Sequence, residues 1–250
     1  MSPFDLIRAQ QLMEPQRRAT RASSPCGACA VRHLTVCAPL EDRELAEVAS
    51  ISTTLEIDPG EPLFDEGEPA DKVFNITAGC VKVYKLLADG RRQVTGFLFA
   101  GDFLGLSNDA HYAYSAEAVT HACLCRFNRR KLEALLERHP KMEKRLLSMA
   151  SNELAAAQEQ MLLLGRKTAK EKIASFLLML SRRAQQRGQA GNPVSVPMSR
   201  TDIGDYLGLT TETVSRTFTH LKTAGTIRML SGGRIELVEI EPIRDLAEGG

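Results

Sequence analysis

The stretch from Ser199 to Gly225 constrains the fold more than any other part of the sequence. Residues 199–202, Ser-Arg-Thr-Asp, have the pattern of a helix N-terminus. Residues 207–210, Leu-Gly-Leu-Thr, predict a tight turn, after which Thr210 can cap a second helix that ends at Gly225. Two helices joined by a short glycine-containing turn form a helix-turn-helix. Residues 227–238, with Ser-Gly-Gly at their centre, predict a β-hairpin wing beside it.

The second helix is expected to have a buried and an exposed face. At about 100° per residue, Val214, Phe218 and Leu221 fall in one narrow sector, with Glu212, Ser215 and Arg216 opposite. Arg donates to guanine, Glu accepts from cytosine, and Ser can do either, which favours contact with DNA bases. The alternative is that Glu212 and Arg216 are only a surface ion pair, contributing ~0.2–0.5 kcal/mol. The residues expected to hold backbone phosphates are Thr210, Thr211, Arg200 and Lys222.

Basic residues are concentrated in the C-terminal part of the chain. Residues 166–234 contain twelve Lys and Arg against four Asp and Glu, a net charge of +8, whereas the whole chain carries +1. A localised basic segment indicates a surface for a polyanion, although a solvated basic face is the alternative. The sequence has no nucleophile elbow, phosphate-binding loop or zinc-protease motif, so it does not indicate an enzyme.

The N-terminal residues give no sign of export. Residues 1–11 include Asp5 and Arg8 and lack the apolar segment of a secretory signal. No apolar run approaches the length needed to span a bilayer. We therefore expect a cytoplasmic protein with no membrane partner. In that reducing compartment, the six cysteines are expected to serve in metal binding or redox chemistry rather than in disulfides.

Short apolar runs separated by turns dominate residues 53–127, after a short predicted helix over 40–51. The runs predicted as strands are 73–77, 81–85, 94–99 and 119–127. Many short strands with regular turn signals predict a barrel or jelly roll. We expect an α+β chain with a flexible arm over 1–25, a cysteine loop and β-roll sensor domain over 26–129, a dimerisation helix over 130–165, and a winged helix-turn-helix domain over 166–250.

The helical part between these domains carries a heptad seam. Its steps are 3, 4, 3, 4 and 3 residues, which keeps one stripe facing a partner in a left-handed coiled coil. The seam has no charged residue, so it predicts a homodimer; the alternative is a helix packed on its own domain. The seam residues are Leu147, Ala150, Leu154, Ala157, Met161 and Leu164.

Three cysteines lie within twelve residues, as Cys26-x2-Cys29-x7-Cys37. A fourth thiol ligand must come from Cys80, Cys123 or Cys125. Cys123 and Cys125 are two residues apart in a predicted strand, so they face the same side. Four thiolates suit a 4Fe–4S cluster or a structural zinc ion, and buried cysteines without metal are the third possibility.

The segment DIGDYLGLTTETVSR, Asp202 to Arg216, closely resembles the recognition motif of the FNR branch of the cyclic-AMP receptor protein/FNR superfamily. The resemblance runs from Cys26 almost to the C-terminus and includes the glycine-rich β-roll and residues 161–165. It implies a transcription regulator with a β-roll like that of cyclic-nucleotide-binding domains. In that family, the residues that match Glu212, Ser215 and Arg216 contact a palindrome with TTGA-like half-sites.

The same resemblance implies a cofactor. Cys125 matches the distant ligand of FNR-type regulators, so the implied ligands of a 4Fe–4S cluster are Cys26, Cys29, Cys37 and Cys125. The spacing differs from the Cys-x3-Cys-x2-Cys-x5-Cys of some members and resembles that of another, FnrN/FixK-like subgroup. An oxygen-labile cluster that favours the dimer is the implied switch. The alternatives are a regulator that lacks the cluster and holds zinc, haem or a small effector, or a constitutive DNA binder.

Two further expectations come from the resemblance. The cyclic-AMP branch uses a Glu for the ribose and an Arg for the cyclic phosphate, where this chain has Leu106 and Tyr114. Because a buried phosphate needs a cation, no cyclic nucleotide is expected. The loop 87–92 resembles the RNA polymerase contact of activators in the family, although an ordinary hairpin tip is an equally good interpretation.

Overall fold

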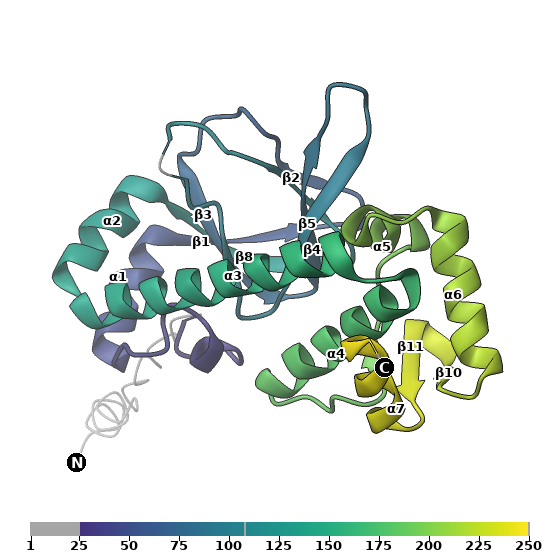
Figure 1. The fold of residues 1–250 in the computed structure, drawn as a ribbon. Coiled ribbons are helices and arrows are strands. Elements are labelled where there is room, and N and C mark those ends of the chain that lie inside the picture. Colours follow the sequence, from purple (N-terminus) through teal and green to yellow (C-terminus); the bar gives the residue numbers. More distant parts are fainter. Residues whose placement is uncertain (1–25, 108, 250) are drawn as a thin grey trace, which may run out of the picture.

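Two four-stranded antiparallel sheets form a β-roll in the first half of the chain (Figure 1). The computed structural model describes residues 26–107 and 109–249, so the arm predicted over 1–25 lies outside it. One sheet has the strand order β1-β8-β3-β6 and the other β2-β7-β4-β5, and apolar residues such as Ile76, Val81 and Leu124 fill the space between them. The strands are β1 Ser52–Ile57, β2 Pro62–Phe64, β3 Lys72–Ala78, β4 Cys80–Leu86, β5 Arg92–Phe99, β6 Phe103–Leu104, β7 Ser115–Ala118 and β8 Ala122–Asn128.

The predicted strands match β3, β4, β5 and β8, and the predicted jelly roll is therefore confirmed. The strand predicted from Val119 begins only at Ala122, because Val119 and Thr120 donate their backbone N–H groups to Cys80 in a turn. Strands β2 and β6 have three and two residues, too few to show an alternating pattern.

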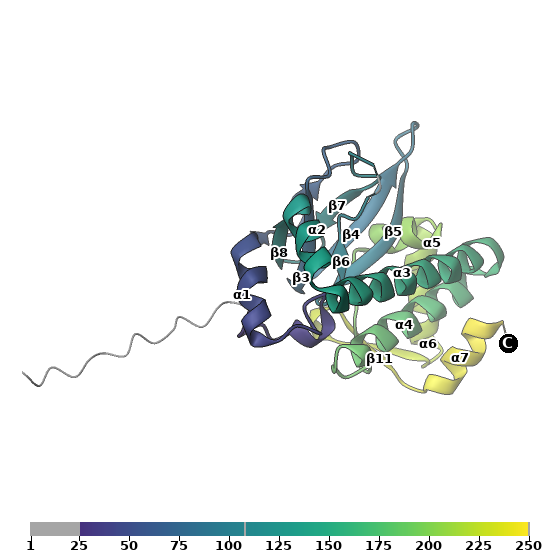
Figure 2. The same ribbon diagram turned by 90° about the vertical axis from the view of Figure 1, so that its left-hand side faces the viewer.

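The helical region predicted over 130–165 is two helices, α2 Arg129–Arg138 and α3 Pro140–Arg166, rather than one. His139 separates them with backbone angles outside the helical region (φ −125°, ψ 74°). The residue before a proline avoids the helical conformation, whereas Pro140 itself is favoured at the first position of a helix. Helix α1 Asp42–Ile51 packs beside α2, and α3 runs from them along the β-roll to the C-terminal domain (Figure 2).

The C-terminal domain is the predicted winged helix-turn-helix. Capping boxes at Thr168 and Ser199 begin α4 and α5, the second where the sequence predicts a helix N-terminus, and the wing is the β10–β11 hairpin. A last helix, α7, packs on α4. The elements are α4 Ala169–Gln186, β9 Val194–Ser195, α5 Arg200–Leu207, α6 Thr211–Thr223, β10 Ile227–Met229, β11 Arg234–Leu237 and α7 Ile240–Glu248, with short 3-10 helices at Arg32–Leu34 and Ser231–Gly233.

The β-roll and the C-terminal domain share one hydrophobic core. The rings of Phe97 on β5, Phe176 on α4 and Tyr206 on α5 have centroids 5.2–6.1 Å apart. This packing holds the helix-turn-helix against the β4–β5 sheet and leaves α6 on the outer side of the molecule (Figure 1). Across 26–107 and 109–249, none of the helices combines the length and apolarity required to cross a membrane.

Candidate DNA interface and cysteine site

Two glycines fix the angle between α5 and α6. Gly208 ends α5 in the left-handed conformation (φ 62°), which glycine adopts without strain. A Cβ atom added to Gly204 would lie 2.6 Å from the carbonyl oxygen of Leu209, so only glycine allows the turn to approach α5 this closely. Thr210 then caps α6 by accepting a hydrogen bond from the N–H of Thr213.

Helix α6 has the two faces that its sequence predicts. Val214, Phe218 and Leu221 are at most 3% exposed and form part of the domain core. On the outer face, the exposed Glu212, Ser215 and Arg216 line a shallow hollow together with Thr211. The three side chains proposed to contact bases therefore lie on one accessible surface at the start of the helix.

The carboxylate of Glu212 is ionised and available. Its own backbone N–H and the Thr210 hydroxyl hold the pKa of Glu212 below its usual value, with a smaller contribution from the charge of Arg216. In the described part of the chain, no ion pair joins Glu212 to Arg216. The interpretation of these two residues only as a surface ion pair therefore has no support in the geometry.

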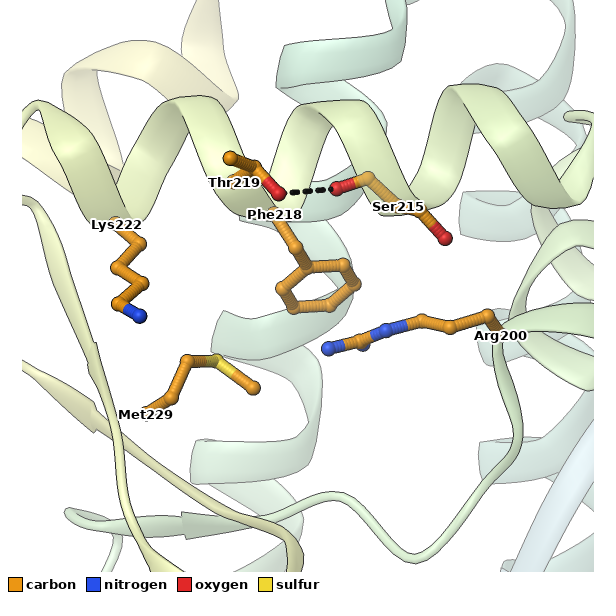
Figure 3. Close-up of a pocket in the computed structure, with 6 residues that line it drawn as sticks. All are labelled: Arg200, Ser215, Phe218, Thr219, Lys222 and Met229. Carbon is orange, nitrogen blue, oxygen red and sulfur yellow. Dashed lines mark hydrogen bonds between the residues drawn. The ribbon is translucent and has the colours of Figure 1, made fainter.

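A second hollow, beside the first, is lined by cationic groups (Figure 3). The guanidinium carbon of Arg200 lies 3.6 Å from the centroid of the Phe218 ring, an arrangement that fixes the side chain by a cation–π contact. Desolvation lowers the pKa of Arg200. Lys222 and Met229 line the same hollow. The sequence predicts Arg200 and Lys222 as phosphate contacts but gives no indication of the stacking on Phe218.

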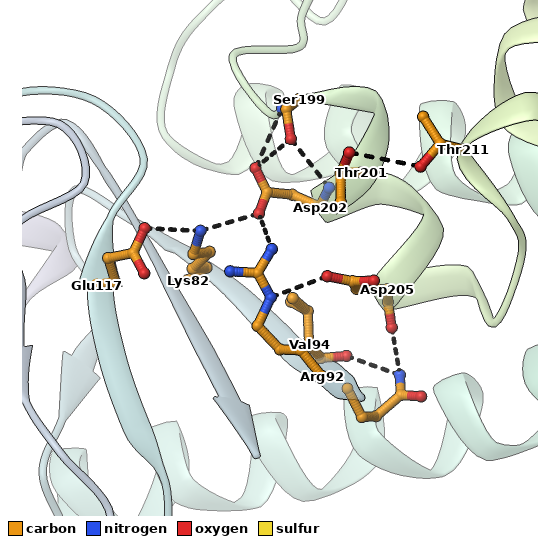
Figure 4. A network of polar contacts seen from close by, with 10 residues as sticks. Lys82, Arg92, Val94, Glu117, Ser199, Thr201, Asp202, Asp205 and Thr211 are labelled. Atoms are coloured by element: carbon orange, nitrogen blue, oxygen red, sulfur yellow. Dashed lines mark hydrogen bonds and ion pairs between the residues drawn. The ribbon is translucent and has the colours of Figure 1, made fainter. Parts of the chain in front are cut away.

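An ion-pair network that local sequence patterns do not reveal connects the helix-turn-helix to the β-roll (Figure 4). Lys82 Nζ lies 2.8 Å from Glu117 Oε1 and 2.9 Å from Asp202 Oδ1, and Arg92 pairs with both Asp202 and Asp205 at 2.9 and 2.8 Å. Burial alone would raise the pKa of Asp202. The hydrogen bonds from Ser199 and Lys82 and the charges of Lys82 and Arg92 outweigh burial and hold this pKa below its usual value. The one visible signal in the sequence is a lysine inside an apolar strand.

The structure groups the four cysteines that the resemblance selects. Cys37 is buried, and Cys26 and Cys125 pack against the same small core. Burial raises the pKa of Cys37 to about 12; the Thr35 hydroxyl opposes this, and the neighbouring thiols Cys26, Cys125 and Cys29 add to it. Burial and the same neighbours raise the pKa of Cys125 to about 11. Cys80 lies in the core that the β-roll shares with the C-terminal domain, beside Phe97 and Phe99.

The four thiols are the donor set that a 4Fe–4S cluster or a structural zinc ion would use. Within the described ranges, no three His, Cys, Asp or Glu side chains converge as ligands of one metal ion. In a 4Fe–4S site each of four thiolates binds a different iron, so the sulfur atoms surround the cluster and do not meet at one point. Four neighbouring thiols beside a small core are compatible with that arrangement in chemistry.

Helix α3 contacts the cysteine loop at one end and the helix-turn-helix at the other. Arg145 Nη2 donates to the carbonyl oxygen of Leu34 at 2.8 Å, between Cys29 and Cys37. At the far end, Gln160 Nε2 donates to the carbonyl oxygen of Tyr206 on α5 at 2.7 Å. The two contacts are fifteen residues apart, about 22 Å along the helix.

Comparisons with known proteins assign the family. Residues 54–139 match the cyclic nucleotide-binding domain and residues 171–246 match the Crp-like helix-turn-helix domain. The chain is 40% identical over 222 residues to the nitrogen fixation regulation protein FixK of Bradyrhizobium diazoefficiens, covering 89% of this chain and 93% of that protein. The chain belongs to the Crp/Fnr family of regulators.

Other members of the Crp/Fnr family agree with this assignment. The transcriptional activator protein FnrL of Cereibacter sphaeroides is 38% identical, over 90% of this chain and 92% of that protein. The structure of FixK2 from Bradyrhizobium japonicum matches with a TM-score of 0.73 and 38% identity, over 78% of this chain and 97% of that chain.

The β-roll of this Crp/Fnr member has aromatic rings where the family resemblance places a ligand. Phe64 and Tyr112 stack at 3.8 Å between centroids, and Tyr114 lies 5.7 Å from Phe64. The Tyr114 hydroxyl accepts a hydrogen bond from the N–H of Gly105, and Leu106 is 42% exposed. Neither Leu106 nor Tyr114 offers a charge to a cyclic phosphate, and the absence of cyclic nucleotide binding stays a prediction.

Most of the predicted seam of α3 lies open in the single subunit. Leu147, Leu154 and Met161 are 61–68% exposed, and Ala150 and Ala157 are exposed between them. Leu164, at the end of the seam, is half-buried against the domain core beside Gly208. A stripe of large apolar side chains left in solvent is typical of a surface that a partner covers.

Proposed function

We propose that this Crp/Fnr regulator binds, as a dimer, a palindromic site with TTGA-like half-sites and responds to oxygen through a 4Fe–4S cluster held by Cys26, Cys29, Cys37 and Cys125. The observation that carries the DNA-binding part is the exposed row of Glu212, Ser215 and Arg216 on a helix whose opposite face is buried. The names of its relatives, which are transcriptional activators or regulators, favour a role in activation.

Base contacts and phosphate contacts come from different residues. Arg216 can donate two hydrogen bonds to guanine, and Glu212 can accept from cytosine in the major groove. Thr211, and Arg200 and Lys222 in the neighbouring hollow, would contact the DNA backbone. Thr210 contributes through the cap that sets the direction of the α6 N-terminus.

The cysteine site supplies the signal. A bound 4Fe–4S cluster provides a centre that oxygen destroys and that ties four thiolates together. Three of these thiolates belong to the loop that Arg145 fastens to α3, and the fourth belongs to β8. Loading the site therefore restrains the loop, the β-roll and the start of α3 relative to one another.

Helix α3 carries this restraint to the dimer and to the DNA-binding domain. Its seam side chains are exposed for a second copy, while Gln160 bonds to the first helix of the helix-turn-helix. An α3 that is held at the cysteine loop favours one packing of the seam, and a dimer presents two α6 helices to successive major grooves. Loss of the restraint lowers the dimer population and the DNA affinity.

A further partner is RNA polymerase. The hairpin tip between β4 and β5 projects from the β-roll, and Leu86 and Leu87 are 61% and 46% exposed there (Figure 1). Large apolar side chains at an exposed tip favour a protein contact over a solvated turn.

The test is anaerobic purification followed by analysis of iron and acid-labile sulfide. We expect about four of each per chain, together with tight binding to a TTGA palindrome. Cys125→Ser is expected to abolish iron uptake, whereas Cys123→Ser and Cys80→Ser retain it. Wild-type protein that holds zinc or no metal at all, yet binds the palindrome equally well, would favour the cluster-free alternative. Absence of preference for the palindrome would contradict the DNA-binding proposal itself.

A further inference from the structure

Asn75 is a buried polar residue whose amide oxygen has no hydrogen-bond partner in the part of the chain that the structure describes. It lies in the middle of β3 and is 2% exposed, and its amide oxygen Oδ1 has no hydrogen bond. The amide nitrogen makes no hydrogen bond within the described residues either. An unpaired buried amide is costly to a fold, so such a group in a well-packed strand indicates a missing partner.

The strand register places Asn75 beside Cys125. The two residues are direct partners in the antiparallel β3–β8 ladder, so their side chains project from the same face of the sheet. The residues next to Asn75 and Cys125 along β3 and β8 show which face of the sheet this is. Val73 and Phe127 pack in the small core that contains Cys37, whereas Phe74, Ile76 and Leu124 face the space between the two sheets.

No other described group in this region forms a hydrogen bond with the Asn75 amide. On the opposite side of β3, Asn75 pairs with Phe103, which is apolar and packs against the same small core. In the cysteine loop, the buried hydroxyl of Thr35 is already engaged, since it donates to the carbonyl oxygen of Arg32 and accepts from the N–H of Cys37. The unpaired amide therefore faces the side of the sheet on which the cysteines gather.

We propose that the Asn75 amide donates a hydrogen bond to sulfur at the Cys125 corner of the bound cluster, and so stabilises the loaded site. This inference rests on the proposed cluster. A half-turn about the Cβ–Cγ bond exchanges the amide oxygen and nitrogen, which allows the NH2 group to face the sulfur. Thiolate and sulfide carry the negative charge of such a site, and hydrogen bonds to them set its reduction potential and its retention.

The proposal predicts opposite effects on the empty and the loaded protein. Asn75→Leu replaces the amide by an apolar group of nearly the same shape. Metal-free protein carrying this substitution should unfold at the same or a higher urea concentration than wild type, because an unpaired polar group has been removed. The loaded variant, kept under argon, should lose iron to a chelator about 10-fold faster, the lower end of the range for residues that support metal ligands. Its reduction potential should fall.

Thr54 provides a matched control because it pairs with Cys125 from the other side, on β1, and its side chain is exposed. Thr54→Val should leave the rate of iron loss unchanged. If Asn75→Leu does not fold, Asn75→Asp keeps the shape and replaces the donor by an acceptor, and it should accelerate iron loss in the same way.

Three results would overturn the inference. If Asn75→Leu destabilises the metal-free protein and leaves the rate of iron loss unchanged, the amide stabilises the fold, with a bound water as its hydrogen-bond partner, and not the cluster. Equal iron loss and equal potential in wild type and Asn75→Leu would remove this role of Asn75 and leave the proposed cluster intact. Wild-type protein that takes up neither iron nor sulfide under anaerobic reconstitution would end both proposals.

Discussion

Lys82 Nζ and Asp202 Oδ1 form a buried ion pair of 2.9 Å that joins the β-roll to the first helix of the helix-turn-helix. The two residues are 120 positions apart in the sequence, and their side chains are 6% and 11% exposed. Arg92, also on the β-roll, contacts the same carboxylate. These charged groups add to the aromatic packing that holds the DNA-binding domain against the β-roll.

Removing the lysine should lower the stability of the fold. Lys82→Met leaves the Glu117 carboxylate without its ammonium partner, and breaking a buried pair in this way costs about 3–5 kcal/mol. Because Arg92 still neutralises Asp202, we expect about 3 kcal/mol, measured by urea unfolding with circular dichroism. Lys85→Met is the matched control on the same strand, since its ion pair with Glu66 is exposed and should change stability by less than about 0.5 kcal/mol. Equal effects from the two substitutions would contradict the role of the buried pair.

The same network predicts a loss of stability in acid. The pKa of Asp202 is lower in the folded protein than in the unfolded chain, where it is about 3.9. The stabilisation is therefore complete above about pH 4 and is lost as the pH falls through the folded pKa. The melting temperature measured by thermal unfolding should show this decline between pH 7 and pH 3. In Asp202→Asn it should fall less steeply as the pH is lowered. A melting temperature that falls with the same slope in both proteins would show that other carboxyl groups govern the loss of stability in acid.

The seam of α3 should be needed for association and not for folding. Burying Leu154 contributes about 1.5–3 kcal/mol, and a dimer contains two copies, so Leu154→Lys should raise the dimer Kd by about 100-fold or more. The exposed position of Leu154 in one subunit means that the monomer should stay folded. Leu162→Lys is the control, because Leu162 is equally exposed but lies outside the seam. Dimers that tolerate Leu154→Lys and dissociate with Leu162→Lys would place the interface on another face.

The local parts of this structure were predictable because local hydrogen bonds determine them. The caps at Thr168, Ser199 and Thr210 and the two faces of α6 follow from residue type and helix period. The break at His139 is encoded locally as well, in Pro140, which favours the first position of a new helix.

Contacts between segments that are distant in the sequence could not be predicted from residue type and helix period. Spacing alone left Cys80, Cys123 and Cys125 as equal candidates, and only the family resemblance favoured Cys125. In the structure Cys125 packs against the small core that contains Cys37, whereas Cys80 belongs to a different core, and the choice of Cys125 as a ligand stays a prediction. The partners of Lys82 and the isolation of Asn75 depend on strand register and domain packing, which no short pattern specifies.

Base contact and phosphate contact should be separable on α6. Arg216→Ala should weaken binding to the palindrome by ~1–3 kcal/mol and relax the preference at one base pair. Lys222→Ala should weaken binding to all sequences alike and reduce the dependence on salt by about one charge. Fluorescence anisotropy with single-base variants of the site at several salt concentrations measures both effects. A uniform loss for Arg216→Ala would assign it to the phosphate backbone.

The link between the cysteine site and the α3 seam is the central claim, and sedimentation equilibrium tests it most directly. Protein reconstituted with iron and sulfide under argon should be mainly dimeric at concentrations at which the same sample, after exposure to air, is mainly monomeric. Cys125→Ser should be monomeric under both conditions. A dimer population that is the same before and after air, in protein that has demonstrably gained and lost its iron, would contradict the account.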